Sequence, residues 1–564
     1  MYVLGINAAF HDSSAALLRD GIPVAAAEEE RFTRIKHAKR PMPLLSHQLP
    51  FAAMNYCLAE AGITLADVDR IAYSYNPDLC GPGKSLPGST GFGRYEAAFL
   101  EGVRSAPRML REDVPHHLRR RFELPPGSQP APIEFLDHHL AHAASAYFAS
   151  GFEESAVLTL DGRGEHATSL LGLGVGRRIE KLAETNFPHS LGLLYEQVTS
   201  HLGFLNSSDE YKVMALASSG DDRFAPALRE AVRVSSHGSY SIAPIDFTAI
   251  AGPARKSWDP LEPRHFDLAR AAQVVLEETA LELARWLHER TGSKNLCMAG
   301  GVALNCVMNA RIRDEGPFEN VFVQPAAGDA GTSLGAAFLA HAAATGARPE
   351  YVMRDAYLGP GYSEEQIQRA LKRSKMTYSR PDDIAAATAA ILAENKIAGW
   401  FQGRMEFGPR ALGARSIVAS PRDPEMKERL NTIKDREEFR PVAPAVLAER
   451  AADYFEDAAP DPFMLFIRKV RPERKHEIAA ARHVDGTARI QTVSKEDAPD
   501  FYALISAHGE LTGTPVVVNT SFNSLGRPIV CSPEDALECY ATTPLDALAI
   551  GPFLLEKSTA REPA

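Results

Sequence analysis

Near its start the chain carries VLGINAAFHDSSAALL at residues 3–18, and a similar run, VLTLDGRGEHATSLLG, returns at residues 157–172. In each, an apolar run typical of a strand ends at a polar residue, Asn7 or Asp161, and a short loop with a histidine leads into a second apolar run. Such patterns predict β-hairpins. The repeat indicates a duplicated α/β domain, with chance similarity as the alternative because strand–loop–strand patterns are common.

Helical and strand patterns alternate after this repeat. Residues 268–290 have the spacing of an amphipathic helix, and the apolar run at 295–298 is typical of a strand. Residues 346–364 are rich in Gly and Pro and show no periodicity, which favours a linker. We therefore expect one domain at residues 1–345 and a second α/β domain at residues 365–564.

Composition and charge exclude several function classes. Of 564 residues, 45% are hydrophobic and 24% charged, as in ordinary globular proteins. The net charge of −11 argues against binding nucleic acid or an anionic membrane as the main task. Six cysteines without a CxxC pair are typical of reduced thiols. No signal peptide or membrane span is expected, so we predict a cytoplasmic protein without nucleic-acid or membrane partners.

A histidine-rich run, DHHLAHAASAYFAS at residues 137–150, is a candidate metal site. Asp137 can cap a helix, and His138 and His142 then project from the same helix face, where they can share a metal. His139 points about 100° away and is a poorer partner. Spacing alone is a weak signal, and a capped, Ala-rich packing helix is the alternative.

Two aspartates strengthen the prediction of a metal site. Asp161 follows an apolar strand and precedes Gly162, while Asp329 lies in QPAAGDAGTSLGAA, between a strand and a helix of small residues. Carboxylates at strand ends beside glycines often bind metals or phosphates. Two imidazoles and two carboxylates would suit Fe(II), Zn or Mn. Either aspartate alone could instead be a helix N-cap.

Other motifs point to anionic ligands. GGVALN at residues 300–305 exposes backbone N–H groups before a helix, which suits phosphate or ribose, although glycines needed for tight packing are the alternative. The second domain spaces its arginines among Gly, Pro and apolar residues in GRMEFGPRALGARS (403–416) and KDREEFRP (434–441). The planar guanidinium group of arginine matches the geometry of a phosphate, so these residues predict a binding site for a small polyanion. For each arginine taken alone, a surface ion pair is the alternative.

Taken together, the motifs resemble the NodU/CmcH family of O-carbamoyltransferases over essentially the whole chain. The matching strings are FHDSSAALL, AEEERFTRIKH, HHLAHAASAY, LDGRGE, AGGVALN, DAGTSLGAA, GRMEFGPRALGARSI, KDREEFRPVAP and NTSFNSLGRPIV. The resemblance implies an N-terminal domain of the actin/sugar-kinase superfamily, similar to the tRNA threonylcarbamoyltransferase. It also implies a C-terminal domain resembling threonylcarbamoyl-adenylate synthase.

The resemblance further implies a two-step reaction. Carbamoyl phosphate and ATP, with Mg²⁺, would give carbamoyl adenylate in the C-terminal domain, and the N-terminal domain would pass the carbamoyl group to a hydroxyl of a natural product, such as an antibiotic, or of a sugar. The iron ligands would be His138, His142, Asp161 and Asp329. His11, a candidate base, and Lys36 would lie near the transferred group. Nucleotide contacts would come from Gly300, Gly301, Asn305 and Asn519. Carbamoyl phosphate contacts would come from Arg410, Arg415, Lys434, Arg440, Arg489 and Arg527.

Three other functions stay open at this point, as do the acceptor and a homo-oligomeric assembly. A tRNA threonylcarbamoyl-type enzyme is disfavoured because the chain has a net charge of −11, whereas tRNA binding favours a basic surface. An actin-like ATPase scaffold without transfer leaves PRALGARS and NTSFN unexplained. A zinc peptidase would need the HExxH glutamate, and the chain has His139 there.

Overall fold

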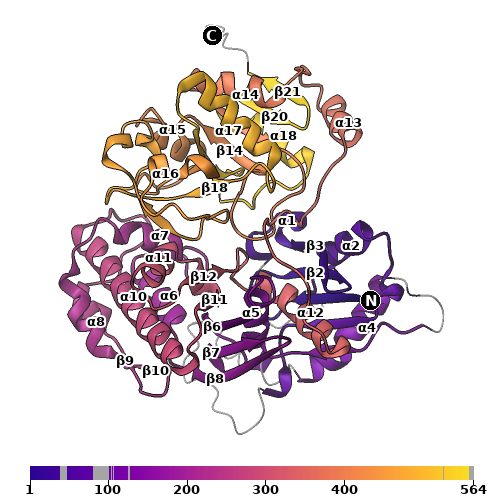
Figure 1. The fold of residues 1–564 in the computed structure, drawn as a ribbon, viewed down its shortest axis with the longest axis vertical. Coiled ribbons are helices and arrows are strands. Elements are labelled where there is room, and N and C mark those ends of the chain that lie inside the picture. Colours follow the sequence, from indigo (N-terminus) through magenta and orange to yellow (C-terminus); the bar gives the residue numbers. More distant parts are fainter. Residues whose placement is uncertain are drawn as a thin grey trace. The chain divides into compact units, whose positions relative to one another are not determined.

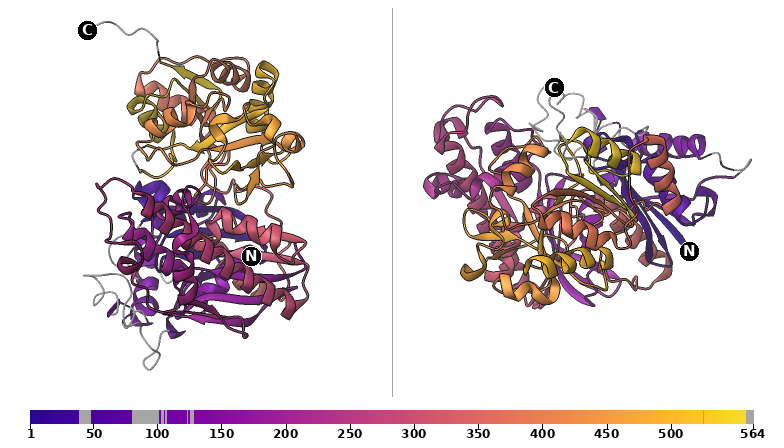
Figure 2. Two further views of the ribbon diagram at one scale, coloured as in Figure 1. Left: turned by 90° about the vertical axis from the view of Figure 1, so that its left-hand side faces the viewer. Right: turned by 90° about the horizontal axis from the view of Figure 1, so that it is seen from above.

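The computed structural model divides the chain into two compact units, Met1–Met353 and Arg354–Ala564 (Figure 1). It describes residues 1–38, 48–79, 101–102, 105, 107–122, 124, 128–524 and 526–557. The division falls between helices α12 (Ala330–Thr345) and α13 (Glu364–Ser374). Two further views show the helices and strands of each unit (Figure 2).

The first unit contains two five-stranded sheets with the same strand order. One runs β3 (Ile22–Glu28), β2 (Ser14–Arg19), β1 (Tyr2–Asn7), β4 (Arg70–Tyr73), β5 (Ile133–Phe135). The other runs β8 (Arg178–Asn186), β7 (Ala167–Val175), β6 (Glu154–Leu160), β11 (Asn295–Ala299), β12 (Asn320–Val323). In both, the first three strands are antiparallel hairpin neighbours and the last two run parallel to the central strand. The shared topology confirms the duplicated α/β domain that the repeat predicted.

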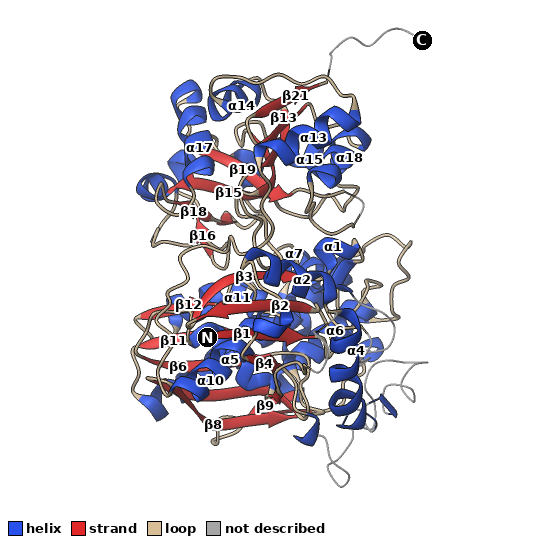
Figure 3. Ribbon diagram, turned by 90° about the vertical axis from the view of Figure 1, so that its right-hand side faces the viewer, coloured by secondary structure: helices blue, strands red, loops and turns tan. Residues whose placement is uncertain are grey.

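Two helices of small residues join the sheets. Helix α12 packs on β1, β2 and β4, helix α5 (His138–Tyr147) packs on β6, β7 and β11, and the two helices pack against each other. Figure 3 shows α5 among the strands of this unit. The backbones approach so closely that a Cβ on Gly335 would lie 1.8 Å from the carbonyl oxygen of Ala141. This packing brings the first residues of α5 and α12 to the end of β6.

We expect Gly335→Ala to destabilise the first unit by at least about 1–3 kcal/mol, because the methyl group would collide with the α5 backbone, which cannot rotate away. The midpoint of thermal unfolding checks this. Ala344→Ser, on the exposed side of the same helix, should stay within about 0.5 kcal/mol of wild type. A Gly335→Ala protein as stable as the Ala344→Ser control would contradict the packing.

Helix α2 (Phe51–Glu60) packs on β2 and β3, helix α10 (Pro263–Thr291) packs on β6 and β7, and several other helices pack against α10. Further helices of this unit include α1 (Glu30–Thr33), α4 (Val114–Arg121), α6 (Leu191–His201), α7 (Glu210–Ala217), α8 (Ala225–Ala231), α9 (Phe247–Ala251) and α11 (Cys306–Glu315). A small hairpin pairs β9 (Val232–Val234) with β10 (Tyr240–Ile242). None of the described helices combines the length and apolar character that crossing a membrane requires.

The second unit is a seven-stranded mixed sheet with helices on both faces. Its order is β18 (Gln491–Val493), β15 (Ala443–Leu447), β19 (Val516–Ser521), β14 (Arg415–Ala419), β13 (Ile397–Phe401), β20 (Ala547–Ile550), β21 (Phe553–Glu556). Helices α14 (Ile384–Ala393) and α17 (Pro499–Thr512) share one apolar core with the sheet. Helices α13, α15 (Met426–Ile433) and α18 (Pro533–Thr542) share the core on the other face. Short elements α16 (Ala451–Tyr454), β16 (Ile467–Lys469) and β17 (Thr487–Arg489) lie at the periphery of this sheet.

Candidate functional site

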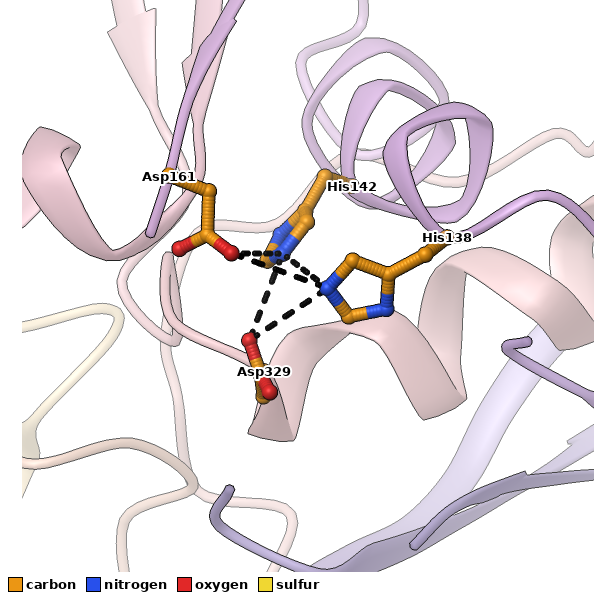
Figure 4. A group of neighbouring side chains, drawn as sticks. All are labelled: His138, His142, Asp161 and Asp329. Atoms are coloured by element: carbon orange, nitrogen blue, oxygen red, sulfur yellow. Dashed lines mark hydrogen bonds and ion pairs between the residues drawn. The ribbon is translucent and has the colours of Figure 1, made fainter. Parts of the chain in front are cut away.

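Four buried side chains converge where α5, β6 and α12 meet. His138 and His142 come from α5, Asp161 follows β6, and Asp329 precedes α12 (Figure 4). The two Nε2 atoms are 3.2 Å apart, and each lies 3.5 Å from Asp329 Oδ1. Asp161 Oδ2 lies 3.7 Å from the Nε2 of His138 and 3.8 Å from that of His142. One donor atom from each residue thus faces a common centre.

The surroundings orient these donor atoms as metal ligands. His138 donates its Nδ1–H to the carbonyl oxygen of Ser74 at 3.1 Å, which leaves the Nε2 lone pair directed at the centre. Asp161 accepts the backbone N–H of Gly301 at Oδ1, at 2.7 Å, and keeps Oδ2 for the centre. Two imidazole nitrogens and two carboxylate oxygens fit a divalent metal such as Fe(II), Zn or Mn.

The charges in this cluster favour a bound cation. Burial alone would lower the pKa of His138, but the carboxylates of Asp329 and Asp161 raise it well above its usual range. Burial alone would raise the pKa of Asp161, and the two imidazoles instead hold it far below its usual value. A divalent metal would compensate the two buried carboxylates without placing protons between imidazole nitrogens 3.2 Å apart.

His139 does not belong to this cluster, as its predicted direction indicated. It donates Nε2–H to the carbonyl oxygen of Ala167 at 3.0 Å, and its Nδ1 accepts from Thr159 Oγ1 at 2.8 Å. Burial, with His138 nearby, lowers the pKa of His139 to about 3. The ring is therefore a neutral structural link from α5 to β6 and β7.

A second polar cluster lies beside the metal site and contains the predicted catalytic residues His11 and Lys36. Asp12 accepts from His11 Nδ1 at 2.8 Å and from His37 Nδ1 at 2.9 Å. Burial would raise the pKa of Asp12, but His11 and His37 hold it well below its usual range. Lys36 Nζ lies 3.5 Å from Ser208 Oγ. Sequence reasoning missed Asp12 and His37, although both adjoin predicted residues within quoted motifs.

This second cluster, composed of His11, Asp12, Lys36 and His37, is tied to the metal site by packing. The Phe10 ring packs edge-on against His138, with centroids 5.9 Å apart. A Cβ on Gly328, the residue before Asp329, would lie 3.8 Å from Asp12 Oδ2. The loop between β1 and β2 therefore lies against the candidate metal ligands.

The predicted nucleotide contacts in the first unit are engaged in the fold. Gly300 has φ +93°, and a Cβ there would lie 2.1 Å from the carbonyl oxygen of Leu160, so close packing requires glycine. Gly301 holds Asp161, as described above. Asn305 caps α11 by accepting from Met308 N–H at 3.0 Å, and its amide pairs with Gln273. Nucleotide contact by Gly300, Gly301 and Asn305 stays a prediction.

In the second unit, two of the predicted residues lie at the end of β19. Lys434 is buried and donates to Ser521 Oγ at 3.0 Å, to the Ser521 carbonyl and to Asn523 Oδ1. Burial, with Arg436 and Arg440 nearby, holds the pKa of Lys434 well below its usual range. Asn519 donates to the carbonyl oxygen of Ala411 at 3.1 Å and to Gln491 Oε1 at 2.7 Å. The crowding of Lys434 with two arginines favours an anionic ligand here.

The remaining predicted arginines differ in position. Arg415 is fully buried, stacks on Phe401 and donates to backbone carbonyls, among them those of Gln402 and Pro360 at 2.9 Å, so its guanidinium is engaged in the fold. Arg527 is exposed and pairs with Glu538 at 2.7 Å. The other three lie in the loop before β14, in the loop after α15 and at the end of β17: Arg410, Arg440 and Arg489.

Comparison with known families matches most of both units. A family model described as carbamoyltransferase N-terminus matches residues 2–81 and 126–338, and one described as carbamoyltransferase C-terminus matches residues 389–557. The chain belongs to the carbamoyltransferase family.

Individual relatives extend over nearly the whole chain. An uncharacterised protein of Synechocystis sp. is 40% identical and the alignment covers 99% of this chain and 97% of the relative. The nodulation protein NolNO of Sinorhizobium fredii is 39% identical over 98% of this chain and 80% of the relative. Among solved structures, T. kodakarensis HypF aligns with 61% of this chain and 48% of its own, at 15% identity and a TM-score of 0.36.

Proposed function

We propose that this carbamoyltransferase works in two steps. The second unit, with Mg²⁺, would convert carbamoyl phosphate and ATP into carbamoyl adenylate, and the first unit would transfer the carbamoyl group from the adenylate to a hydroxyl of a small molecule. The observation that carries the proposal is the buried cluster of His138, His142, Asp161 and Asp329, whose ligand atoms all lie within 4.8 Å of one another.

The chain's own residues would position the reacting groups in the first unit. Fe²⁺ or another divalent metal held by the four-residue cluster would supply a Lewis acid for the carbamoyl carbonyl. The close packing of α5 and α12 buries these four side chains, so bulk water does not reach them from the side that the two helices cover. Exclusion of water matters because carbamoyl adenylate is a mixed anhydride that water would hydrolyse.

In the second unit, Lys434, Arg410, Arg440 and Arg489 would hold the phosphates, and Asn519 would contact the nucleotide. Lys434 supports this proposal because its surroundings are buried and carry an excess of positive charge. A bound polyanion would neutralise that charge, and its oxygens match the donors of arginine and lysine. Arg415 and Arg527 are left out of the proposed contacts, since Arg415 is fully buried and stacked on Phe401, and Arg527 is exposed and paired with Glu538.

The proposal is tested by mass spectrometry of reactions that contain ATP, carbamoyl phosphate, Mg²⁺, Fe²⁺ and a panel of sugars, polyols, aminoglycosides and N-acetylglucosamine oligomers. We expect a mass gain of one carbamoyl group on at least one panel member, dependent on both ATP and carbamoyl phosphate. In parallel, hydroxylamine should trap the adenylate as hydroxyurea. Absence of both hydroxyurea and any carbamoylated product would overturn the proposal.

A further inference from the structure

We propose that His37, oriented by Asp12, is the base that takes the proton from the acceptor hydroxyl. The inference rests on the proposed transfer to a hydroxyl and goes beyond it, because it assigns the proton-accepting atom. That atom is His37 Nε2. Asp12 acts through His37 and is a positioning residue.

His37 lies between a hydroxyl and a carboxylate, an arrangement that helps the hydroxyl to lose its proton. Ser208 Oγ lies 2.9 Å from His37 Nε2, and His37 Nδ1 lies 2.9 Å from Asp12 Oδ1. A hydroxyl, an imidazole and a carboxylate in this order form the arrangement by which a hydroxyl gives up its proton to a histidine. Lys36 Nζ, 3.5 Å from the same Ser208 oxygen, adds a cation on that oxygen. The acceptor hydroxyl would take the position of Ser208 Oγ beside His37 Nε2.

His11, the base predicted from sequence, is less suited to the role. Its Nδ1 faces the Asp12 carboxylate at 2.8 Å, and its Nε2 faces the carbonyl oxygen of Ser207 at 2.7 Å. A carboxylate and a carbonyl oxygen are both acceptors, so each ring nitrogen must carry a hydrogen. A ring that donates from both nitrogens has no lone pair for a substrate proton. His11 instead balances the charge of Asp12.

The backbone holds this arrangement in place. Asp12 has φ +44° and His37 has φ +63°, conformations that non-glycine residues rarely adopt. Asn7 supports the first strained segment by donating from Nδ2 to the carbonyl oxygens of His11 at 2.9 Å and Asp12 at 3.1 Å. The Glu30 carboxylate supports the second by accepting the backbone N–H of His37. The two imidazole rings lie 4.4 Å apart on opposite oxygens of Asp12.

The step balances without another reactant. As the acceptor oxygen bonds to the carbamoyl carbon, its proton moves to His37 Nε2, and the bond from that carbon to the phosphate oxygen of the adenylate breaks. AMP leaves as a phosphate anion that needs no proton, and His37 later returns its proton to water. The products are a carbamate ester and AMP.

The test compares His37→Asn with wild type, using the panel member that wild type carbamoylates fastest. Asparagine keeps a donor for Asp12 but offers no basic nitrogen. We expect kcat for transfer to fall roughly 10²- to 10⁴-fold, with the acceptor KM nearly unchanged. Trapping of carbamoyl adenylate by hydroxylamine should stay at the wild-type rate. His201→Asn, a partly buried histidine that contacts Gly252 on another face of the unit, is the matched control and should retain transfer.

Two further variants separate His37 from its neighbours. In Ser208→Ala the acceptor still supplies the hydroxyl, so carbamate ester should still form at a measurable rate. His11→Gln should lose less activity than His37→Asn. Full transfer by folded His37→Asn, or a larger loss in His11→Gln, would overturn the inference. A carbamoyl group found on Ser208, with transfer lost in Ser208→Ala, would also overturn it by making Ser208 the acceptor. If hydroxylamine traps nothing from wild type, the proposed function itself fails.

Discussion

Replacing Asp329 by asparagine is expected to reduce carbamoyl transfer by at least roughly 10³-fold while hydroxylamine trapping of the adenylate continues at the wild-type rate. Asp329 Oδ1 lies 3.5 Å from the Nε2 of both His138 and His142, so the variant loses one of two buried negative charges at the centre of the cluster. Lewis-acid stabilisation by a metal is worth several kcal/mol, and each 1.4 kcal/mol corresponds to about tenfold in rate. Separate assays of trapping and transfer check this split.

Metal content gives a second readout for the same variant. Purified Asp329→Asn should bind less Fe²⁺, Zn²⁺ or Mn²⁺ than wild type at equal protein concentration. His139→Gln is the matched control, since His139 lies on the same helix but faces Thr159 and Ala167, and it should keep its metal. A folded Asp329→Asn protein that loses adenylate formation together with transfer would contradict the assignment of the cluster to the second step.

Replacing Lys434 by methionine is expected to reduce carbamoyl adenylate formation roughly ten- to hundred-fold. A charge-assisted contact to an anion is worth roughly 1.5–3 kcal/mol, which corresponds to that range. Lys434 follows α15 and is buried near Arg436 and Arg440, which with burial hold its pKa well below its usual range, so a bound anion would favour its charged form. The measurement is the rate of hydroxyurea formation at limiting carbamoyl phosphate.

Two controls test whether the effect of Lys434→Met is confined to adenylate formation. Arg527→Ala removes an exposed cation already paired with Glu538, and we expect adenylate formation within about twofold of wild type. When carbamoyl adenylate is supplied directly, Lys434→Met should transfer as well as wild type. Continued failure with the supplied intermediate would place Lys434 outside the first step.

The grouping of two histidines and two aspartates could be predicted because each of these residues leaves a local signal. His138 and His142 are one helical turn apart, and Asp161 and Asp329 each follow an apolar strand. The duplicated topology could also be predicted, since β1–β2 and β6–β7 repeat one hairpin pattern. Both features follow from the regular geometry of a helix or a hairpin, so a short stretch of sequence is enough to predict them.

The roles of Arg415 and His37 could not be predicted in the same way. The carbonyls that engage Arg415 include that of Pro360, which is 55 residues away in the chain. His37 meets Ser208 across 171 residues, and its orientation depends on a backbone with φ +63°. Neither long-range contacts nor a strained backbone leaves a periodic pattern in sequence. Resemblance to a family indicated a set of basic residues, and the structure shows that these residues differ in burial and in hydrogen-bond partners.

The most direct test of the two-step account is the stoichiometry of nucleotide product to carbamate ester in the wild-type reaction. With carbamoyl phosphate, ATP and the best acceptor, the account predicts that one AMP appears for each carbamate ester, and that omission of ATP stops ester formation. Ester formed at an undiminished rate without ATP, or accompanied by ADP in place of AMP, would contradict the account.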